Sequence, residues 1–133
     1  MVPYEVIYSL TEAILKIDKS IRWVCVANKD GIIINERTRE GLKLLLTEEE
    51  NEEYAANAIS RQKTRRKFEP KIGGLIYAFG KYENVNRATI PINENYYVLL
   101  TFDSRESNFD QIIMDKIIPN IHKNKEQFNS DAG

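Results

Sequence analysis

The stretch WVCVANKDGIIINER, residues 23–37, holds two apolar runs that are separated by the polar turn Lys29-Asp30-Gly31. Residues 21–28 are rich in β-branched and aromatic types, and both alternating sets of side chains are apolar. This pattern is typical of a central strand that is covered on both faces. Asp30 and Gly31 can adopt the positive φ angles of a tight turn, so residues 31–36 are predicted to return as the second strand of a hairpin. The stretch therefore predicts the centre of a sheet.

Helices are predicted on both sides of this hairpin. Residues 4–17 repeat apolar side chains every three or four positions, which is the pattern of an amphipathic helix that starts after Pro3. Thr47 and Glu50 match a capping box, in which each side chain accepts a hydrogen bond from the other residue's backbone amide. The helix that begins there is predicted to run to about Arg66. Its apolar stripe is predicted to consist of Tyr54, Ala55, Ala58, Ile59 and Gln62.

The second half of the chain predicts a meander of strands. Strand-like runs at 75–82, 85–92 and 96–102 are joined by short polar connections, which favours antiparallel pairing. The order helix, strand, strand, helix, three strands and helix is that of an α+β domain, with one sheet and helices packed on it.

The end of the chain predicts a last helix and a tail. The helix is expected to start at about Ser107, and Pro119 either kinks it or ends it. Residues 125–133 are polar and are expected to form a disordered tail after a single domain of residues 1–124.

Composition argues against several classes of protein. The 133 residues suit one domain, and the hydrophobic share of 42% and charged share of 29% are those of a globular protein in water. The net charge of −1 gives no overall attraction to nucleic acid or to anionic membranes. The longest purely aliphatic run is Ile32-Ile33-Ile34, and the first residues lack a secretory pattern, so we expect no membrane insertion and a cytoplasmic location.

The order of elements and the hairpin VANKDGIII, residues 26–34, resemble the roadblock, or dynein-light-chain-type, domain of the roadblock/longin/profilin-like group. The basic helix end SRQKTRRKFEPKIGG (60–74) and the strand pair YAFGKYENVNRATIPI (77–92) resemble small archaeal proteins of roadblock-like type. The resemblance implies a five-stranded antiparallel sheet in the order 2-1-5-4-3 and homodimerisation through the second helix and third strand. It also implies a scaffolding or small-GTPase-regulating role without a catalytic residue or cofactor. The leucine-rich loop at 41–46 and the highly charged second helix depart from the family pattern.

The charges of the second helix are segregated along its length, with acidic residues at 48–53 and basic residues at 61–67. Charges that complement the helix dipole contribute about 0.3–1 kcal/mol each, but the like-charged pair Arg61 and Arg65 costs roughly a few tenths of a kcal/mol. In an antiparallel pair of these helices, each acidic start would face the other helix's basic end, so we expect a two-fold homodimer. The strand at 75–82 could pair across the same axis. The candidate interface residues are Glu49, Glu52, Ala55, Ala58, Ile59, Arg61, Arg65 and Tyr77.

A second interpretation of the basic segment is nucleic-acid binding. Its cations could neutralise phosphates, and Tyr77, Phe79 and Tyr82 could stack on bases. The near-zero net charge and the acidic first half of the same helix argue against this interpretation. Its candidate residues are Arg61, Lys63, Arg65, Arg66 and Lys67.

A third interpretation is a ligand pocket, because a layered sheet can cup a small molecule. Its candidate lining consists of Trp23, Phe79, Tyr96 and Tyr97, although aromatic residues in strands belong to a core far more often.

No pattern in the sequence indicates catalysis or a metal site. A single cysteine, Cys25, and a single histidine, His122, allow neither an intrachain disulfide nor a cysteine-based zinc cluster. Residues 103–107, DSRES, are interpreted as a helix start at which Ser104 or Ser107 accepts from free amides. Glycine motifs for phosphate binding are absent. We therefore expect a non-enzymatic interaction module without a cofactor.

Overall fold

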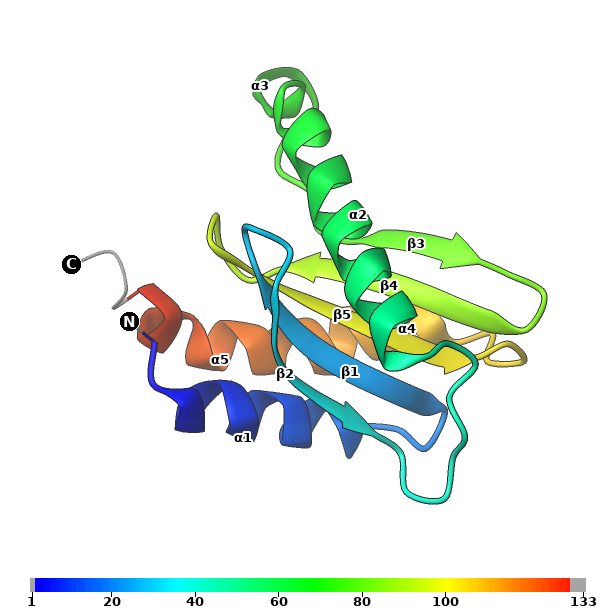
Figure 1. The fold of residues 1–133 in the computed structure, drawn as a ribbon. Coiled ribbons are helices and arrows are strands. Elements are labelled where there is room, and N and C mark those ends of the chain that lie inside the picture. Colours follow the sequence, from blue (N-terminus) through cyan, green and yellow to red (C-terminus); the bar gives the residue numbers. More distant parts are fainter. Residues whose placement is uncertain (1, 130–133) are drawn as a thin grey trace.

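A five-stranded antiparallel sheet forms the centre of the computed structural model, which describes residues 2–129 (Figure 1). Its strands lie in the order β2-β1-β5-β4-β3. The bounds are β1 Ile21–Asn28, β2 Ile33–Thr38, β3 Ala78–Lys81, β4 Val85–Pro91 and β5 Tyr96–Asp103. The predicted α+β class and strand order are confirmed, and the apolar strand β1 is indeed internal to the sheet.

Helices cover the two faces of the sheet unequally. In Figure 1, α1 (Tyr4–Leu15) and α5 (Ile118–Asn129) run side by side beneath one face, whereas α2 (Glu48–Arg66) crosses the other face alone. The end of α2 and the short helix α3 (Glu69–Ile72) extend beyond the sheet. Within the described residues 2–129, no helix is long and apolar enough to cross a bilayer.

Alternation along β1 explains why the sheet has a core on each side. Val24 and Val26 pack in the larger cluster with residues of α1 and α5, whereas Trp23, Cys25 and Ala27 pack in the smaller cluster with α2. Successive side chains of a strand point to opposite faces, so an all-apolar strand needs a cover on both. The predicted two-faced burial of this strand is confirmed.

The hairpin turn is built by Asn28 and Gly31. The Asn28 side chain accepts hydrogen bonds from the backbone amides of Asp30 (2.9 Å) and Ile32 (3.1 Å). These bonds hold residues 30–32 in the turn, so β2 starts at Ile33 rather than at the predicted Gly31. Gly31 has φ +80°, and a Cβ on it would lie 2.7 Å from the Cα of Ala56 in α2. Glycine is therefore required here both by backbone conformation and by close packing.

β3 begins three residues later than the predicted 75, because its partner strand ends in a proline. Ala78 pairs with Thr89, and the same register would place Ile76 opposite Pro91. Proline has no amide hydrogen to donate to the ladder, so regular pairing stops before it.

The C-terminal helical segment continues through Pro119. It starts with α4 (Phe109–Ile112), passes through the π-helical turn η1 (Ile113–Ile117) and proceeds as α5. The amide of Ile118 donates to the carbonyl of Ile113, five residues earlier. This wider turn accommodates the proline ring, which clashes with the carbonyl four residues before it in a regular α-helix. Pro119 was predicted to kink or end the helix. Instead, the helical segment continues through Pro119 by way of this π-turn.

Both ends of this segment differ from expectation. Asn108 occupies the N-cap position of α4 without a side-chain capping bond, so the prediction that Ser104 or Ser107 caps the helix is wrong. α5 runs on to Asn129, and the buried ring of Phe128 packs edge-on against Tyr96 at 5.5 Å. Residues 125–129 are therefore helical, which differs from the expected tail, and residues 130–133 lie outside the described part of the chain.

Candidate interaction surface

Helix α2 is fixed at its start by the predicted capping box. The amide of Glu50 donates to Thr47 Oγ1 (3.1 Å), and the amide of Thr47 donates to Glu50 Oε1 (2.9 Å). Its buried stripe consists of Asn51, Ala55, Ala58, Ile59 and Gln62. Ala55, Ala58 and Ile59 were expected in a contact between helices, but they pack against the chain's own sheet and are at most 2% exposed.

The charged interface candidates occupy two separate flanks of α2. At 100° per residue, Arg61 lies roughly 120° around the helix from Glu49, and Arg65 roughly 140° from Glu52. The contact of Ala56 with Gly31 turns one flank, which includes Glu49 and Glu52, toward the β1–β2 hairpin. The other flank, with Tyr54, Arg61 and Arg65, faces β4 and β3, because the Tyr54 ring stacks on Arg87 of β4. The structure therefore does not gather all these residues on one line of contact.

The basic end of α2 is only partly free. Arg66 Nη2 donates to the carbonyl oxygen of Glu94 (2.9 Å) and to the hydroxyl of Tyr97. Arg61, Lys63, Arg65 and Lys67 are exposed. Arg66 thus serves to hold the helix end against the sheet, and the four other cations of the basic segment are exposed to solvent.

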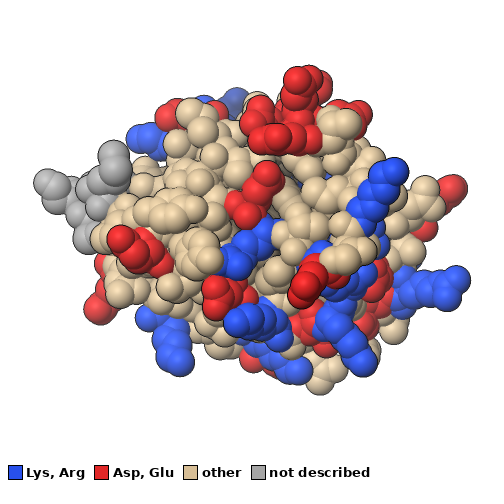
Figure 2. Space-filling model, turned by 60° about the horizontal axis from the view of Figure 1, so that its bottom comes forward, with Lys and Arg blue, Asp and Glu red and all other residues tan. Residues whose placement is uncertain are grey.

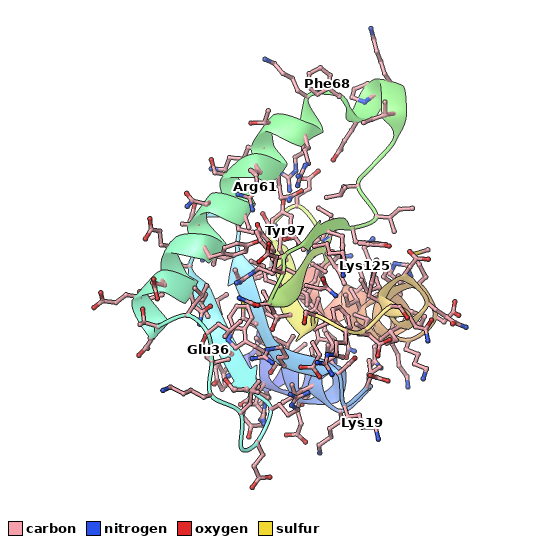
Figure 3. All side chains as sticks on the ribbon, turned by 90° about the vertical axis from the view of Figure 1, so that its right-hand side faces the viewer. Lys19, Glu36, Arg61, Phe68, Tyr97 and Lys125 are labelled. Atoms are coloured by element: carbon pink, nitrogen blue, oxygen red, sulfur yellow. The ribbon has the colours of Figure 1, made fainter. Side chains whose placement is uncertain are left out.

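An apolar strip continues from the end of α2 to the edge of the sheet. β3 is an edge strand, and the residues leading to it include Phe68, Ile72 and Ile76, which are 55%, 80% and 58% exposed. Figure 3 shows Phe68 at the far end of α2, away from the sheet, whereas Tyr97 lies between helix and sheet. Large apolar side chains exposed next to an open strand edge are typical of an interaction surface.

Tyr77 is held by its own chain. Its hydroxyl hydrogen bonds to Asp110, and burial together with that carboxylate raises the pKa of Tyr77 to about 12. Phe79 stacks on Phe109 with ring centroids 3.8 Å apart. Both aromatic residues pack with the α1 and α5 cluster, on the face of the sheet opposite α2.

The basic end of α2 therefore lacks two of the three aromatic residues that were expected beside it. Tyr82 is 52% exposed and remains accessible. On the face drawn in Figure 2, lysine and arginine are interspersed with aspartate and glutamate rather than collected in one basic field.

The aromatic residues expected to line one pocket are dispersed. Tyr96 and Tyr97 are neighbours in β5 and belong to different core clusters, because adjacent strand residues face opposite ways. Trp23 is buried and donates from Nε1 to Glu36 Oε2 at 3.1 Å. Two other cavities exist, one of about 600 Å³ at the start of α2 and one of about 560 Å³ at its end. Trp23 lines the first cavity and Tyr97 the second, so neither cavity gathers the expected set. Sequence reasoning did not single out Arg87, an arginine in the mostly buried strand β4 that lines the first cavity.

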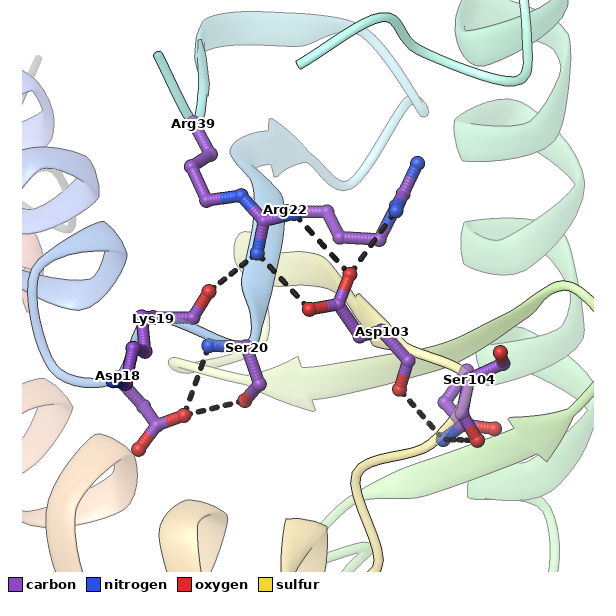
Figure 4. A network of polar contacts seen from close by, with 8 residues as sticks. Asp18, Lys19, Ser20, Arg22, Arg39, Asp103 and Ser104 are labelled. Carbon is purple, nitrogen blue, oxygen red and sulfur yellow. Dashed lines mark hydrogen bonds and ion pairs between the residues drawn. The ribbon is translucent and has the colours of Figure 1, made fainter. Parts of the chain in front are cut away.

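The polar stretch after β5 carries an ion-pair network that joins three connections (Figure 4). Asp103 pairs with Arg22 and Arg39, each at 3.1 Å, and Arg39 also donates to the carbonyl of Lys19. Burial raises the pKa of Asp103, but the hydrogen bonds and charges of both arginines outweigh burial and hold this pKa below its usual 3.8. The network closes one end of the sheet, so Asp103 acts here as a structural anchor.

The remaining chemistry-bearing side chains do not form a reactive site. Cys25 is fully buried, and burial raises the pKa of its thiol, which keeps it protonated and unreactive. His122 is exposed on α5. Residues 2–129 contain no group of three or more His, Cys, Asp or Glu side chains placed to hold a metal ion.

Comparisons with known proteins identify the fold. No protein-family model and no curated protein matches the sequence. MglB from Thermus thermophilus matches with TM-score 0.69 and 12% identity over 96% of this chain and 88% of that one. The Roadblock/LC7 domain from Streptomyces avermitilis matches with TM-score 0.61 and 8% identity over 92% and 97%. The chain has a roadblock-type fold.

The roadblock-type fold was the expectation from the sequence, and it is confirmed. A further roadblock-type match is MglB in a tetrameric arrangement, with TM-score 0.70 and 13% identity over 95% of this chain and 87% of that one. The particular likeness to archaeal proteins stays a prediction.

Proposed function

We propose that this roadblock-type domain is a non-enzymatic homodimeric scaffold that binds other proteins, with a small GTPase as the partner class. The observation that carries the proposal is the surface formed by α2 and β3: a helix of segregated charge lies beside an open strand edge and the exposed Phe68, Ile72 and Ile76. Such a surface combines an apolar contact with charges that fix its direction.

The flank of α2 that faces β3 is the part that a second copy would contact. Because Ala55, Ala58 and Ile59 are buried in the protomer, the contact uses Arg61 and Arg65 rather than these small residues. In an antiparallel arrangement of these flanks, the two cations approach Glu50 in the first turn of the other copy's α2, which lies roughly 20° around the helix from Arg61. Glu49 and Glu52 lie on the opposite flank. The edge of β3 lies on the same side, so it can add backbone pairing to the same interface.

The partner class rests on the resemblance to roadblock domains and on the fold shared with MglB. The tetrameric arrangement of one MglB structure supports self-association as a property compatible with this fold. The described cavities and polar clusters hold no recognisable catalytic constellation, so we assign the chain a binding role.

Sedimentation velocity of the purified chain tests the dimer. We expect a dimer for the wild type and a monomer for the double variant Arg61→Glu with Arg65→Glu, because each replacement sets like charges against the acidic start of the facing helix. The matched control is Lys63→Glu with Lys67→Glu, which makes the same charge change on exposed residues of the other flank and should leave the dimer intact. A wild-type monomer at high protein concentration would refute the proposal.

Nucleic-acid binding by Arg61, Lys63, Arg65 and Lys67 is the alternative, since these four cations of the predicted set are exposed. A gel shift with random-sequence DNA and RNA at low salt distinguishes the two functions. Under our proposal no shift appears, whereas a salt-sensitive shift that both double variants weaken would favour the alternative.

A further inference from the structure

Arg87 lies in the middle of β4 on the face covered by α2. Its cross-strand neighbours are Gly80 on β3 and Thr101 on β5, and Trp23 on β1 follows in the same row. The residue is only 7% exposed. A charged side chain has therefore been placed in the floor of the smaller core, where an apolar residue would be the ordinary choice.

The guanidinium of Arg87 is stacked but not neutralised. Its Cζ lies 3.4 Å from the ring centroid of Tyr54 and 5.7 Å from that of Trp23. Nε and Nη2 are both buried and have no hydrogen-bond partner. Among residues 2–129, no carboxylate lies within the 4.0 Å ion-pairing distance of this side chain. Aromatic rings stabilise a cation over its faces, but they leave the hydrogen-bond donors at its edge unused.

A cavity of about 600 Å³ adjoins this side chain. Its walls are mainly apolar and include Leu44, Leu45 and Leu46 from the loop before α2, and Val85 from β4. The charged lining residues are Arg22, Glu83 and Arg87, and Arg22 is already paired with Asp103. The volume falls within the roughly 300–1,000 Å³ of small-ligand pockets.

The free donors define the chemistry that would fit. Nε and Nη2 form one edge of the guanidinium, where two parallel N–H groups match the two oxygens of a carboxylate. A buried cation without an anion is costly, and a bound carboxylate would offset that cost. A dianionic phosphate suits the site less well, because the walls are apolar and only one guanidinium is unpaired.

We propose that this cavity binds a small carboxylate with an apolar body, such as a medium-chain fatty acid, through Arg87. The carboxylate pairs with the Nε and Nη2 edge, and the hydrocarbon chain lies along the leucine loop. Nε and Nη2 are closed to solvent in this structure, so binding requires Tyr82 to turn aside. The Tyr82 ring fills the space above Gly80, the cross-strand neighbour of Arg87, 3.1 Å from where a Cβ on Gly80 would stand, and Tyr82 is 52% exposed. The site shares Tyr54 with the flank of α2 that carries Arg61 and Arg65, but binding at Arg87 does not itself require a second copy.

Calorimetric titration with decanoate and with the neutral decan-1-ol tests this site. We expect wild-type protein to bind decanoate more tightly than decan-1-ol. Arg87→Met keeps the volume of the side chain and removes its charge, so it should lose about 10- to 100-fold in decanoate affinity with the decan-1-ol affinity unchanged. Arg105→Met removes an exposed guanidinium outside both the cavity and the proposed dimer contact, and it should bind decanoate as the wild type does.

Folding of each variant is checked by circular dichroism, and sedimentation separates loss of binding from loss of the dimer. If Arg87→Met does not fold, Arg87→Lys replaces it; this variant keeps the charge without the two-donor edge and should bind decanoate more weakly than the wild type. Equal wild-type affinity for decanoate and decan-1-ol, or full decanoate binding by the Arg87 variants, would overturn the proposal. Binding of an acidic, leucine-rich peptide but not of decanoate would also overturn it and assign the cavity to a protein partner.

Discussion

At the scale of single residues, Asp103 shows how one carboxylate organises a whole end of the sheet. Its carboxylate accepts hydrogen bonds from Arg22, at the start of β1, and from Arg39, just after β2. Arg39 also binds the connection between α1 and β1 through Lys19. Segments far apart in the sequence therefore meet at one side chain, and no local sequence pattern could have predicted their meeting.

Asp103→Asn should lower the free energy of unfolding by about 1 kcal/mol at neutral pH, a modest value because the carboxyl is partly exposed to water. Because the pKa of Asp103 is lowered by folding, its contribution is present above the ordinary value of 3.8 and is lost as pH falls through the lower folded pKa. Urea unfolding of wild type and variant over this pH range measures the effect. The difference in unfolding free energy between wild type and Asp103→Asn should disappear on acidification. A difference that persists would contradict the ion-pair explanation. Asp115→Asn, at an exposed position of η1, is the control.

At the scale of elements, the strongest local signals gave correct predictions. The apolar strand at 21–28 and the capping box at Thr47 and Glu50 are confirmed, because both depend on residues adjacent in sequence. The late start of β3 depends instead on Pro91 of its partner, and the burial of Phe128 depends on Tyr96. A polar stretch at the end of the chain looks like a tail until the position of its single aromatic residue in the fold is known.

Gly31→Ala tests the contact between the hairpin and α2. The new methyl group would meet the Ala56 backbone at 2.7 Å, in addition to the strain of the positive φ angle. We expect a loss of about 2–4 kcal/mol in unfolding free energy, measured by urea denaturation.

The control for this variant is Gly41→Ala, which has a similar φ of +77° but no atom within 4 Å of the added Cβ. Gly41→Ala should lose only about 1 kcal/mol in unfolding free energy, which is the cost of the backbone strain alone. Equal losses in the two variants would show that packing against α2 is unimportant.

At the scale of the whole molecule, the two faces of the sheet have different tasks. The α1 and α5 face holds the larger core, whereas α2 covers its face with small residues and presents its charges outward. The sequence predicted that α2 would be the interacting element, but it could not divide the helix into a buried stripe and two flanks. It also could not reveal Arg87, because the absence of a partner for a charge is a property of the assembled fold.

Salt should weaken the proposed dimer. Screening lengths fall from about 30 Å at 0.01 M salt to about 3 Å at 1 M, so contacts between Arg61, Arg65 and the facing acidic turns lose strength. We expect sedimentation equilibrium to show a dissociation constant that rises about tenfold or more over this range. A constant unaffected by salt would mean that the apolar strip at Phe68, Ile72 and Ile76 holds the dimer instead.

The π-helical turn at Ile113–Ile117 also sets the rotational position, about the helix axis, of all later residues of the helix. A turn that contains one extra residue shifts all later side chains by roughly 100° relative to an uninterrupted α-helix. That shift brings Ile121 and Phe128 onto the core side, where both are at most 1% exposed. Removal of one residue from the turn would leave a more regular helix facing the wrong way, so the irregularity works as a spacer that the C-terminal helix cannot lose.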